Sequence, residues 1–283
     1  MSNTVIRTNV LALNAHRNLG SVGNIQSRAS RNLSSGFRIN SAEDDAAGLA
    51  ISESMRAQIR GLDQASRNAQ DGVSLLQTAE GFLSTVQELA QNMRELAVQG
   101  ANDTYNDTQR GFISNEINQL RSEIGRIQGS AQFNGTNLFG TGGLLEGNLI
   151  LQVGANAGQN INAVTELGTS MANINTLPTT VSTAFAGTDQ AAFDTAITDF
   201  QTFIDDVSGA RAGIGAVINR LEFTIENLDI ASENLSASES RIRDADMAAE
   251  MMQLTQANVL QQAATAMLAQ ANQAPQSVLQ LIG

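Results

Sequence analysis

Few side chains in this sequence could carry out catalysis or bind a metal ion. The 283 residues include one histidine, His16, and no cysteine. A zinc site of the His-Glu-x-x-His type requires two imidazoles on one face of a helix, so that chemistry is excluded. Disulfide bonds and thiol chemistry are excluded too, because both require cysteine. We interpret His16 as a tolerated polar residue, and we expect no metal ion and no cofactor.

The longest run of carboxylates is Glu43-Asp44-Asp45. Adjacent carboxylates can hold a cation or raise the pKa of one of their number. This run, however, stands beside a predicted helix start, where the helix dipole stabilises anions. We therefore interpret the run as structural, with Ser41 and Asp44 capping the helix and Gly100 ending it. The sequence indicates no enzyme.

Two further patterns have a packing explanation. Gly213-Ile214-Gly215 is similar to part of a phosphate-binding loop, but it lies inside a helical run and lacks the preceding strand. We expect a close contact between helices there instead. The side chains of Met247, Met251, Met252 and Met267 could line an adaptable binding groove or pack within a helix stripe. The sequence leaves both interpretations open.

The elements that position these residues are mainly helices. From Ile51 to Ala97 apolar residues recur on average every 3.5 residues. This is the spacing of helices that pack side by side along their length. A shorter helix is predicted from Ile113 to Ala131. A second long run from Phe193 to Leu235 continues through Arg241 and Arg243 into a terminal helix.

The segment between the second and third helices contains turn and strand signals. Asn134-Gly135 predicts a turn. Residues 149–153 and 160–164 flank a glycine-containing segment and predict a β-hairpin. Residues 165–190, rich in Thr, Ala and Ser, predict a surface loop. Short connections favour antiparallel neighbours, so the predicted fold class is mostly α: an elongated antiparallel helical bundle with long coiled-coil helices formed by both termini, plus a small β-hairpin region.

The two ends of the chain carry opposite charges. Residues 1–42 contain five arginines and no acidic residue, and residues 244–283 contain three acidic residues and no basic one. The remaining residues carry a net charge of −14, which argues against binding to nucleic acid. No stretch approaches the roughly 20 apolar residues of a membrane span, so we expect no membrane partner. The first 30 residues do not read as a cleavable signal peptide.

Each end also carries apolar residues every three or four positions, which places them on one face of a helix. A lone amphipathic helix is marginally stable in water and requires a partner surface. Opposite charge makes the other end of the chain the natural partner, so the sequence predicts an assembly protein. The predicted polymerisation interface comprises Ile6, Val10, Leu13, Val22, Ile25, Leu33, Met251, Leu254, Leu260, Met267 and Leu279.

Four motifs resemble those of bacterial flagellins and occur in the family's order. Residues 9–15 are similar to the opening helix, and residues 33–52 (LSSGFRINSAEDDAAGLAIS) to the spoke that joins the inner and outer core. Residues 209–221 resemble the C-terminal core helix, and residues 271–279 resemble the closing sequence. The resemblance covers essentially the whole chain apart from roughly residues 140–190. The spoke residues are Gly36, Arg38, Ile39, Asn40, Asp44 and Asp45.

The resemblance implies an extracellular filament subunit used for swimming, which polymerises with itself. It also implies unfolded export through the flagellar type III apparatus and an export chaperone on the C-terminal helix. The flagellar cap and hook–filament junction proteins would be its other partners. The end segments would be disordered in the free subunit and fold on assembly. The implied domains are an inner coiled-coil domain (residues 1–42 and 244–283, with the spoke extending to about residue 56), a helical core domain (43–140 and 190–243) and a short variable region (141–189).

One more surface is implied by the resemblance. Residues 91–99, with Glu116 on the next helix, are similar to the patch that Toll-like receptor 5 recognises in many flagellins. Recognised members carry Arg where this chain has Asn92. Asn lacks the fork of guanidinium donors, so we expect weakened receptor activation, and lateral packing of subunits is the alternative purpose of the patch. The patch comprises Gln91, Asn92, Arg94, Leu96 and Glu116.

Two alternatives to the filament subunit stay open at this point. The first is a hook–filament junction protein, a homologue with similar ends that is present in a few copies. The second is a secreted helical translocator or effector that inserts helices into host membranes.

Overall fold

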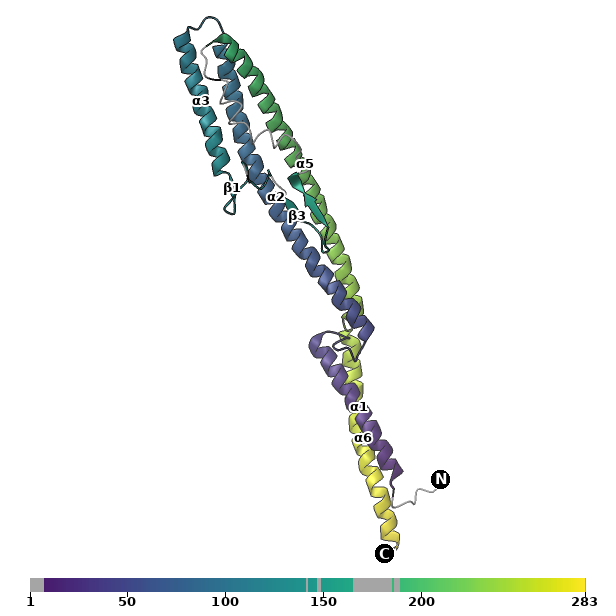
Figure 1. The fold of residues 1–283 in the computed structure, drawn as a ribbon. Helices are drawn as coiled ribbons and strands as arrows, with labels where there is room; N and C mark the ends of the chain where they lie inside the picture. The colour runs from purple at the N-terminus through teal and green to yellow at the C-terminus, as the bar shows by residue number, and fades with distance from the viewer. Residues whose placement is uncertain (1–7, 141, 147–148, 165–184, 186–188, 283) are drawn as a thin grey trace. The chain divides into compact units, whose positions relative to one another are not determined.

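The computed structural model describes residues 8–140, 142–146, 149–164, 185 and 189–282, with side chains up to residue 273. It contains five helices in this part of the chain: α1 (Val10–Ser35), α2 (Ala46–Gly100), α3 (Asp107–Ser130), α5 (Gln190–Arg243) and α6 (Met247–Ile282) (Figure 1). The prediction of a mostly α fold with long helices at both ends and a small hairpin region is confirmed. Most of the predicted loop over residues 165–190 lies outside the described residues.

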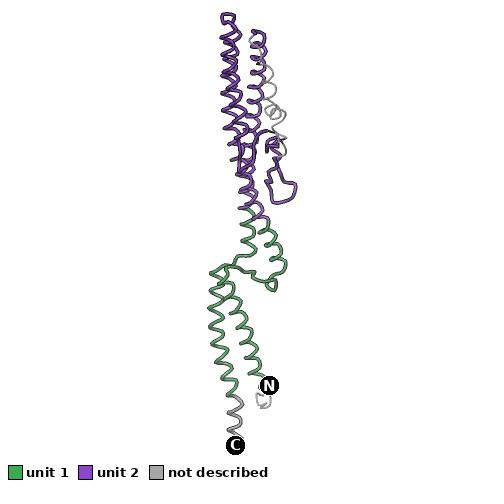
Figure 2. The backbone as a smooth tube through the Cα atoms, turned by 60° about the vertical axis from the view of Figure 1, so that its left-hand side comes forward, with its two compact units in different colours: residues 1–57, 234–283 green, residues 58–233 purple. Residues whose placement is uncertain are grey.

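The chain divides into two compact units, each described here by itself (Figure 2). Unit 1 comprises residues 1–57 and 234–283, and unit 2 comprises residues 58–233. Unit 1 therefore contains α1 and α6, the segment between α1 and α2, and the adjoining ends of α2 and α5.

The helix boundaries follow from local side-chain and backbone chemistry. Asn9 caps α1, because its side chain accepts a hydrogen bond from the Ala12 N–H at 3.0 Å. Gly36 ends α1 in the left-handed conformation (φ 76°), where a glycine is favoured, and its N–H donates to the Asn32 carbonyl. The predicted end of α2 at Gly100 is confirmed.

The predicted cap of α2, Ser41 with Asp44, is wrong. Asp45 caps the helix, since its Oδ1 accepts from the Gly48 N–H at 2.8 Å. The Asp44 carboxylate instead accepts from the backbone N–H groups of Asn40 and Ser41 and from the Ser41 hydroxyl, inside the preceding turn. The residue next to the first helical turn reaches the unpaired N–H groups of that turn, and Asp44 points the other way.

The long run of helical spacing after Phe193 is interrupted before the terminal helix. α5 ends at Arg243 and α6 begins at Met247. The Asp246 carboxylate accepts from the N–H groups of Ala248 and Ala249, so Asp246 starts the new helix. The segment following α1 is hydrogen-bonded to this break.

The core of unit 2 is built by α2, α3 and α5. Its large side chains with less than 2% exposure include Leu76, Leu83 and Met93 on α2, Ile117 and Ile124 on α3, and Phe193 and Phe200 on α5. A polar contact links α2 with α5: Arg211 Nη2 donates to Glu80 at 2.7 Å. The close helix contact expected at Gly213–Gly215 does not occur at Gly215, where an added methyl group would meet nothing within 4 Å. Packing there comes from Ile214, which is fully buried.

Both turn and hairpin predictions are confirmed. Asn134 (φ 50°) and Gly135 (φ 78°) connect β1 (Gln132–Phe133) to β2 (Thr136–Asn137). Two successive positive φ angles are those of the turn that suits the twist of a two-residue hairpin. The second hairpin pairs β3 (Ile150–Gln152) with β4 (Asn160–Asn162) and places Leu151 opposite Ile161.

Glycines in α2 mark where the second hairpin lies against the helix. A Cβ atom at Gly61 would lie 2.8 Å from the Cβ of Ala155, and one at Gly72 would lie 2.6 Å from Leu151. A Cβ at Gly81 would meet nothing within 4 Å. Glycine at positions 61 and 72 lowers the helix propensity of α2, but the absence of a side chain there lets the hairpin approach the helix closely.

Alanine at two of these glycines is expected to have opposite effects on stability. Gly61→Ala should destabilise unit 2 by about 1–3 kcal/mol, because the β3–β4 connection must move. Gly81→Ala should stabilise it by about 0.5–1 kcal/mol through helix propensity. Urea unfolding followed by circular dichroism measures both, and equal effects from the two changes would contradict the described packing.

Candidate functional site

The chain ends form an antiparallel pair of helices, α1 and α6 (Figure 1). Asn9 donates to the carbonyl of Ala271 at 2.7 Å, and Gln26 donates to Asn258 at 2.8 Å. Residue numbers thus rise along α1 as they fall along α6. The predicted pairing of the two ends is present in the structure.

The seam between α1 and α6 has the spacing of a coiled coil. Buried and half-buried side chains follow one another at alternating intervals of three and four residues on both helices. Six of these thirteen side chains are alanines, five are leucine or valine, and each helix contributes one glutamine. The seam residues are Ala12, Ala15, Leu19, Val22, Gln26, Ala29 and Leu33 on α1, and Leu254, Ala257, Gln261, Ala264, Leu268 and Ala271 on α6.

The predicted interface residues divide into two groups. Val22, Leu33 and Leu254 are half-buried in the seam, inside one molecule. The other six described residues remain exposed by 38–59%: Val10, Leu13, Ile25, Met251, Leu260 and Met267. We call these six the exposed apolar set. Ile6 lies outside the described residues, and Leu279 lies in α6 at a position where side chains are not described.

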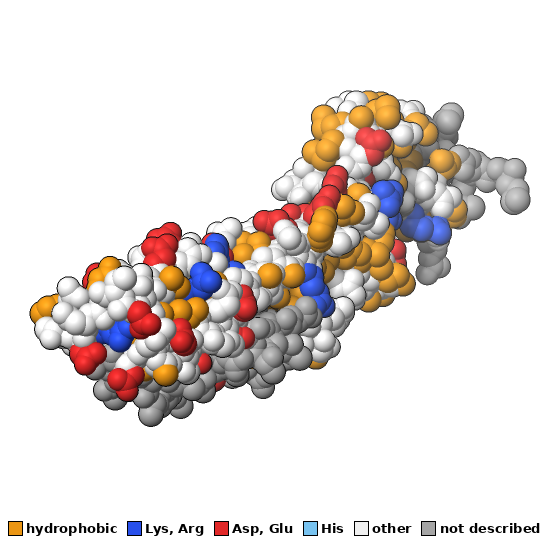
Figure 3. All heavy atoms as spheres, turned by 90° about the horizontal axis from the view of Figure 1, so that it is seen from above, with side chains coloured by type: hydrophobic (Ala, Val, Ile, Leu, Met, Phe, Trp, Pro, Cys, Tyr) orange, Lys and Arg blue, Asp and Glu red, His pale blue; other side chains and the backbone are white. Residues whose placement is uncertain are grey.

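Several hydrophobic side chains of α1 and α6 are exposed. Figure 3 shows hydrophobic side chains (orange) on the surface of the molecule. A groove of about 460 Å³ runs between α1 and α6, with Leu11 and Val22 on one side and Leu260 and Met267 on the other. Intramolecular pairing therefore leaves apolar surface on both helices for another molecule.

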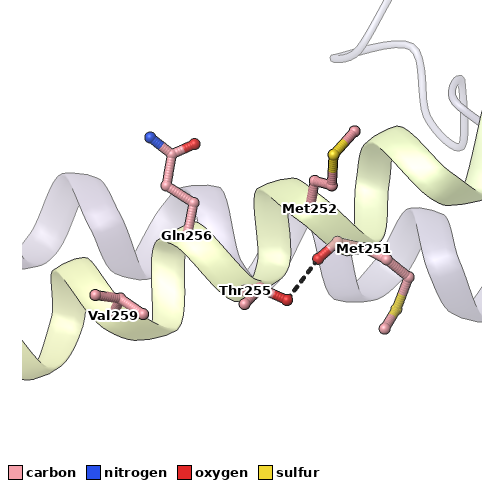
Figure 4. A pocket seen from close by; sticks show the side chains of 5 residues that line it. All are labelled: Met251, Met252, Thr255, Gln256 and Val259. Atoms are coloured by element: carbon pink, nitrogen blue, oxygen red, sulfur yellow. Dashed lines mark hydrogen bonds between the residues drawn. The ribbon is translucent and has the colours of Figure 1, made fainter.

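A second hollow lies on α6 alone (Figure 4). Its lining consists of Met251, Met252, Thr255, Gln256 and Val259. Thr255 donates its hydroxyl to the Met251 carbonyl at 2.8 Å, which leaves the wall largely apolar. The two methionines are 52% and 68% exposed, so they do not pack in the seam. Flexible thioether side chains on an exposed face suit an adaptable contact.

Ion pairing between the two ends does not hold the helices together. Among the described residues no ion pair joins α1 to α6. The acidic residues of the C-terminal segment lie at its start, where Asp246 caps α6 and Glu250 accepts from Asn32. The expectation that opposite charge pairs the ends is therefore wrong at the level of contacts, which are polar and apolar.

The segment between α1 and α2, which contains the predicted spoke residues, is tied to the break between α5 and α6. The Arg38 N–H donates to the Arg243 carbonyl at 2.7 Å, and the Ala245 N–H donates to the Gly36 carbonyl at 2.9 Å. Arg38 also donates from its guanidinium to the carbonyl of Ile242. These bonds form a backbone strap across the two halves of unit 1.

Aromatic and apolar contacts complete the strap. The guanidinium carbon of Arg243 lies 4.8 Å from the centre of the Phe37 ring. Ile39 is 1% exposed and packs against Gly48, where an added Cβ would lie 2.8 Å from the Ile39 Cδ1. Asn40 donates its side-chain amide to Asn32. The six spoke residues therefore lie in one hydrogen-bonded and packed region of unit 1.

Asp44 is the acidic group of the spoke whose protonation matters most. Its side chain is 7% exposed and lies 3.4 Å from the Arg28 guanidinium. Burial raises the pKa of Asp44, but the N–H groups of Asn40 and Ser41 and the charge of Arg28 together outweigh burial. The net pKa is lower than usual for an aspartate.

Asp44→Asn is expected to flatten the acid side of the stability profile. A carboxyl whose pKa is depressed by folding stabilises the native state above its unfolded pKa of about 3.9, and that stability is lost as pH falls through the lower, folded pKa. Urea midpoints of the wild type should therefore drop below about pH 4, and those of D44N should drop less. Exposed Glu43→Gln is the control. A D44N profile parallel to the wild type would contradict the described role.

The predicted receptor patch lies on α2 and α3 of unit 2. Gln91, Asn92 and Arg94 are exposed on α2, and Glu116 is exposed on α3. Leu96 is half-buried and packs against the core. Four of the five side chains are thus available at the surface of the single chain.

The described part of the chain contains no group of three or more side chains of metal-binding type. Nor does any helix in that part have the length and apolar character needed to cross a membrane. The fold and site define a helical structural protein whose ends pair with each other and keep apolar surface for further association.

Comparisons with known proteins agree with this class. Models of the bacterial flagellin N-terminal and C-terminal helical regions match residues 6–142 and 191–282. A flagellin of Halalkalibacterium halodurans is 51% identical over 278 residues, which cover 98% of this chain and 99% of that protein. A flagellar filament 31.3 kDa core protein of Treponema maltophilum is 42% identical over 286 residues, with the same coverage.

A solved structure shows a similar fold. The putative flagellar hook-associated protein from Vibrio parahaemolyticus aligns with a TM-score of 0.54 and 17% identity, over 71% of this chain and 100% of that chain. The chain belongs to the bacterial flagellins. It is a structural subunit that polymerises into the flagellar filament, which lies outside the cell and serves swimming.

Proposed function

We propose that the subunit polymerises by burying the exposed apolar set of α1 and α6 against neighbouring copies. The exposure of these six side chains, after the helices have already paired within one chain, is the observation that carries the proposal. Burial of a leucine- or methionine-sized side chain contributes about 1.5–3 kcal/mol. A repeating contact along a filament therefore supplies a strong driving force, and no catalytic step is required.

The layers of the assembled subunit follow from the same proposal. Residues 1–42 and 244–283 form the inner coiled-coil domain, with the spoke extending to about residue 56. Residues 43–140 and 190–243 form the helical core domain around it, and residues 141–189 form the short variable region. The alanine-rich seam supports this arrangement, because small side chains let two helices lie close together. The interface also includes Ile6 and Leu279.

The same exposed face suits a sequence of partners before assembly. An export chaperone that covers α6 would shield Met251, Met252 and Val259 from water until the chain leaves through the flagellar type III apparatus. The terminal helices then fold as the subunit adds beneath the cap protein, above the hook–filament junction proteins. The six alanines and two glutamines of the seam support this order, because a pair of helices that buries little apolar area is marginal alone.

Polymerisation of purified protein tests the proposed function. Salt-induced growth of filaments, seen by electron microscopy, is the expected result. Purified chains that form no filaments under these conditions would contradict the proposed interface.

Asn92→Arg is expected to strengthen activation of Toll-like receptor 5. A guanidinium restores charge-assisted donors on the exposed face of α2, so the concentration for half-maximal signalling should fall roughly tenfold. A reporter cell line measures this concentration. Asn92→Gln lengthens the side chain without a guanidinium and is the control. Equal signalling by N92R and N92Q would contradict the proposed receptor contact.

A further inference from the structure

Asn32 is a buried polar side chain where three segments of unit 1 meet. It lies in the last turn of α1 and is 3% exposed. Its Nδ2 donates to Glu250 Oε1 on α6 at 2.9 Å, and its Oδ1 accepts from Asn40 Nδ2 in the spoke at 3.1 Å. One amide therefore joins α1 to α6 and to the spoke, with its donor and acceptor ends used separately.

Glu250 depends on this amide. Its Oε2 is buried and has no hydrogen-bond partner among the described residues. Within the same part of the chain, the one hydrogen bond to its Oε1 comes from Asn32. A buried carboxylate without donors is strongly destabilising. The Asn32 side chain thus supplies the hydrogen-bond donor that the Glu250 carboxylate requires.

Apolar packing alone specifies the register of α1 on α6 weakly. Part of the α1 seam repeats after 14 residues, with Ala15 and Ala29 in equivalent positions and Leu19 and Leu33 in the next. A polar residue in a coiled-coil seam fixes register, because a shifted pairing leaves it buried without a partner. Asn32 is next to the seam residue Leu33 and is buried, so the same argument applies to it. It lies one turn inside the backbone strap between Gly36 and Ala245, where the last turn of α1 meets the first turn of α6.

We propose that Asn32 is a positioning residue for filament assembly. Its amide, as donor to Glu250 and acceptor from Asn40, sets the register of α1 on α6. The register in turn fixes where the α1 members of the exposed apolar set lie along the helix pair relative to the α6 members. This inference rests on the proposed role of that set in polymerisation.

Removal of the hydrogen-bond donor at position 32 tests the proposal in the full chain. Asn32→Asp places a second carboxylate opposite Glu250 and removes its donor. The critical concentration for seeded polymerisation at pH 7 should rise about tenfold or more.

The double variant N32D/E250Q distinguishes positioning from simple loss of a residue. The amide introduced at position 250 can donate to the carboxylate introduced at position 32, and Asn40 can still donate to that carboxylate. Polymerisation of the double variant at pH 7 should therefore return to within about twofold of the wild type. Asn24→Asp adds the same charge at an exposed position of α1 and should have little effect.

Two results would overturn the proposal: normal polymerisation of N32D at pH 7, or a double variant as defective as N32D. Circular dichroism shows whether each variant keeps its helices. A wild-type chain that fails to polymerise on the seeds would instead contradict the proposed function of the terminal helices.

Discussion

A chain that lacks residues 1–35 is expected to remain soluble and to form no filaments. The deletion removes α1, so it takes away the seam partner of α6 together with Val10, Leu13 and Ile25 of the exposed apolar set. Unit 2 has its own core and should keep its cooperative unfolding. Because polymerisation depends on repeated burial of these apolar side chains, the loss should be complete. Sedimentation and electron microscopy with wild-type seeds measure it.

Deletion of residues 250–283 is the matched experiment at the other end and should give the same loss. A milder variant, Leu13→Ser with Ile25→Ser, keeps the α1 seam and removes two exposed apolar side chains. It should raise the critical concentration without abolishing helix pairing. Filaments that grow from either truncated chain would refute the proposed interface.

Phe200→Ala is expected to have the largest effect on the stability of unit 2. Phe200 on α5 is fully buried, and its ring stacks on Phe185 with centroids 5.8 Å apart. Removal of a buried phenylalanine side chain loses its transfer free energy and leaves a cavity, which together destabilise by about 3–5 kcal/mol. The midpoint of urea unfolding, followed by circular dichroism, measures the change.

Phe223→Ala provides a control on the same helix. Phe223 is 68% exposed, so its loss should change the free energy of unfolding by less than about 0.5 kcal/mol. Similar losses from the two substitutions would contradict the assignment of the α5 core face. Reduced assembly by F223A with unchanged stability would assign that ring to a contact between subunits.

Most secondary structure could be predicted from the sequence because its signals are local. The 3.5-residue spacing between Ile51 and Ala97 identified α2, and Asn134-Gly135 identified a turn. The cap of α2 was missed because Ser41 and Asp44 have the three-residue spacing of a capping box. Only the direction of the chain before the helix decides which carboxylate reaches the first turn.

The division of the terminal stripes could not be predicted. On α6 the seam uses Gln261 and Leu268, whereas the adjacent Leu260 and Met267 face outward. Adjacent positions give two stripes of the same spacing, and hydrophobicity favours the wrong one. Which stripe faces α1 depends on the strap at the spoke and on contacts such as Gln26 with Asn258, which join residues far apart in the chain. The alanine-rich spacing of the seam residues was the one feature of the sequence that could have indicated which stripe faces α1.

Protection of a single cysteine at Met267 tests the central claim most directly. The natural chain contains no cysteine, so Met267→Cys introduces one thiol on the exposed face of α6. The account predicts rapid reaction with a maleimide in the free subunit, almost none in the assembled filament, and full recovery after the filament is dissociated. Equal rates of reaction in subunit and filament would contradict burial of this face by neighbouring copies.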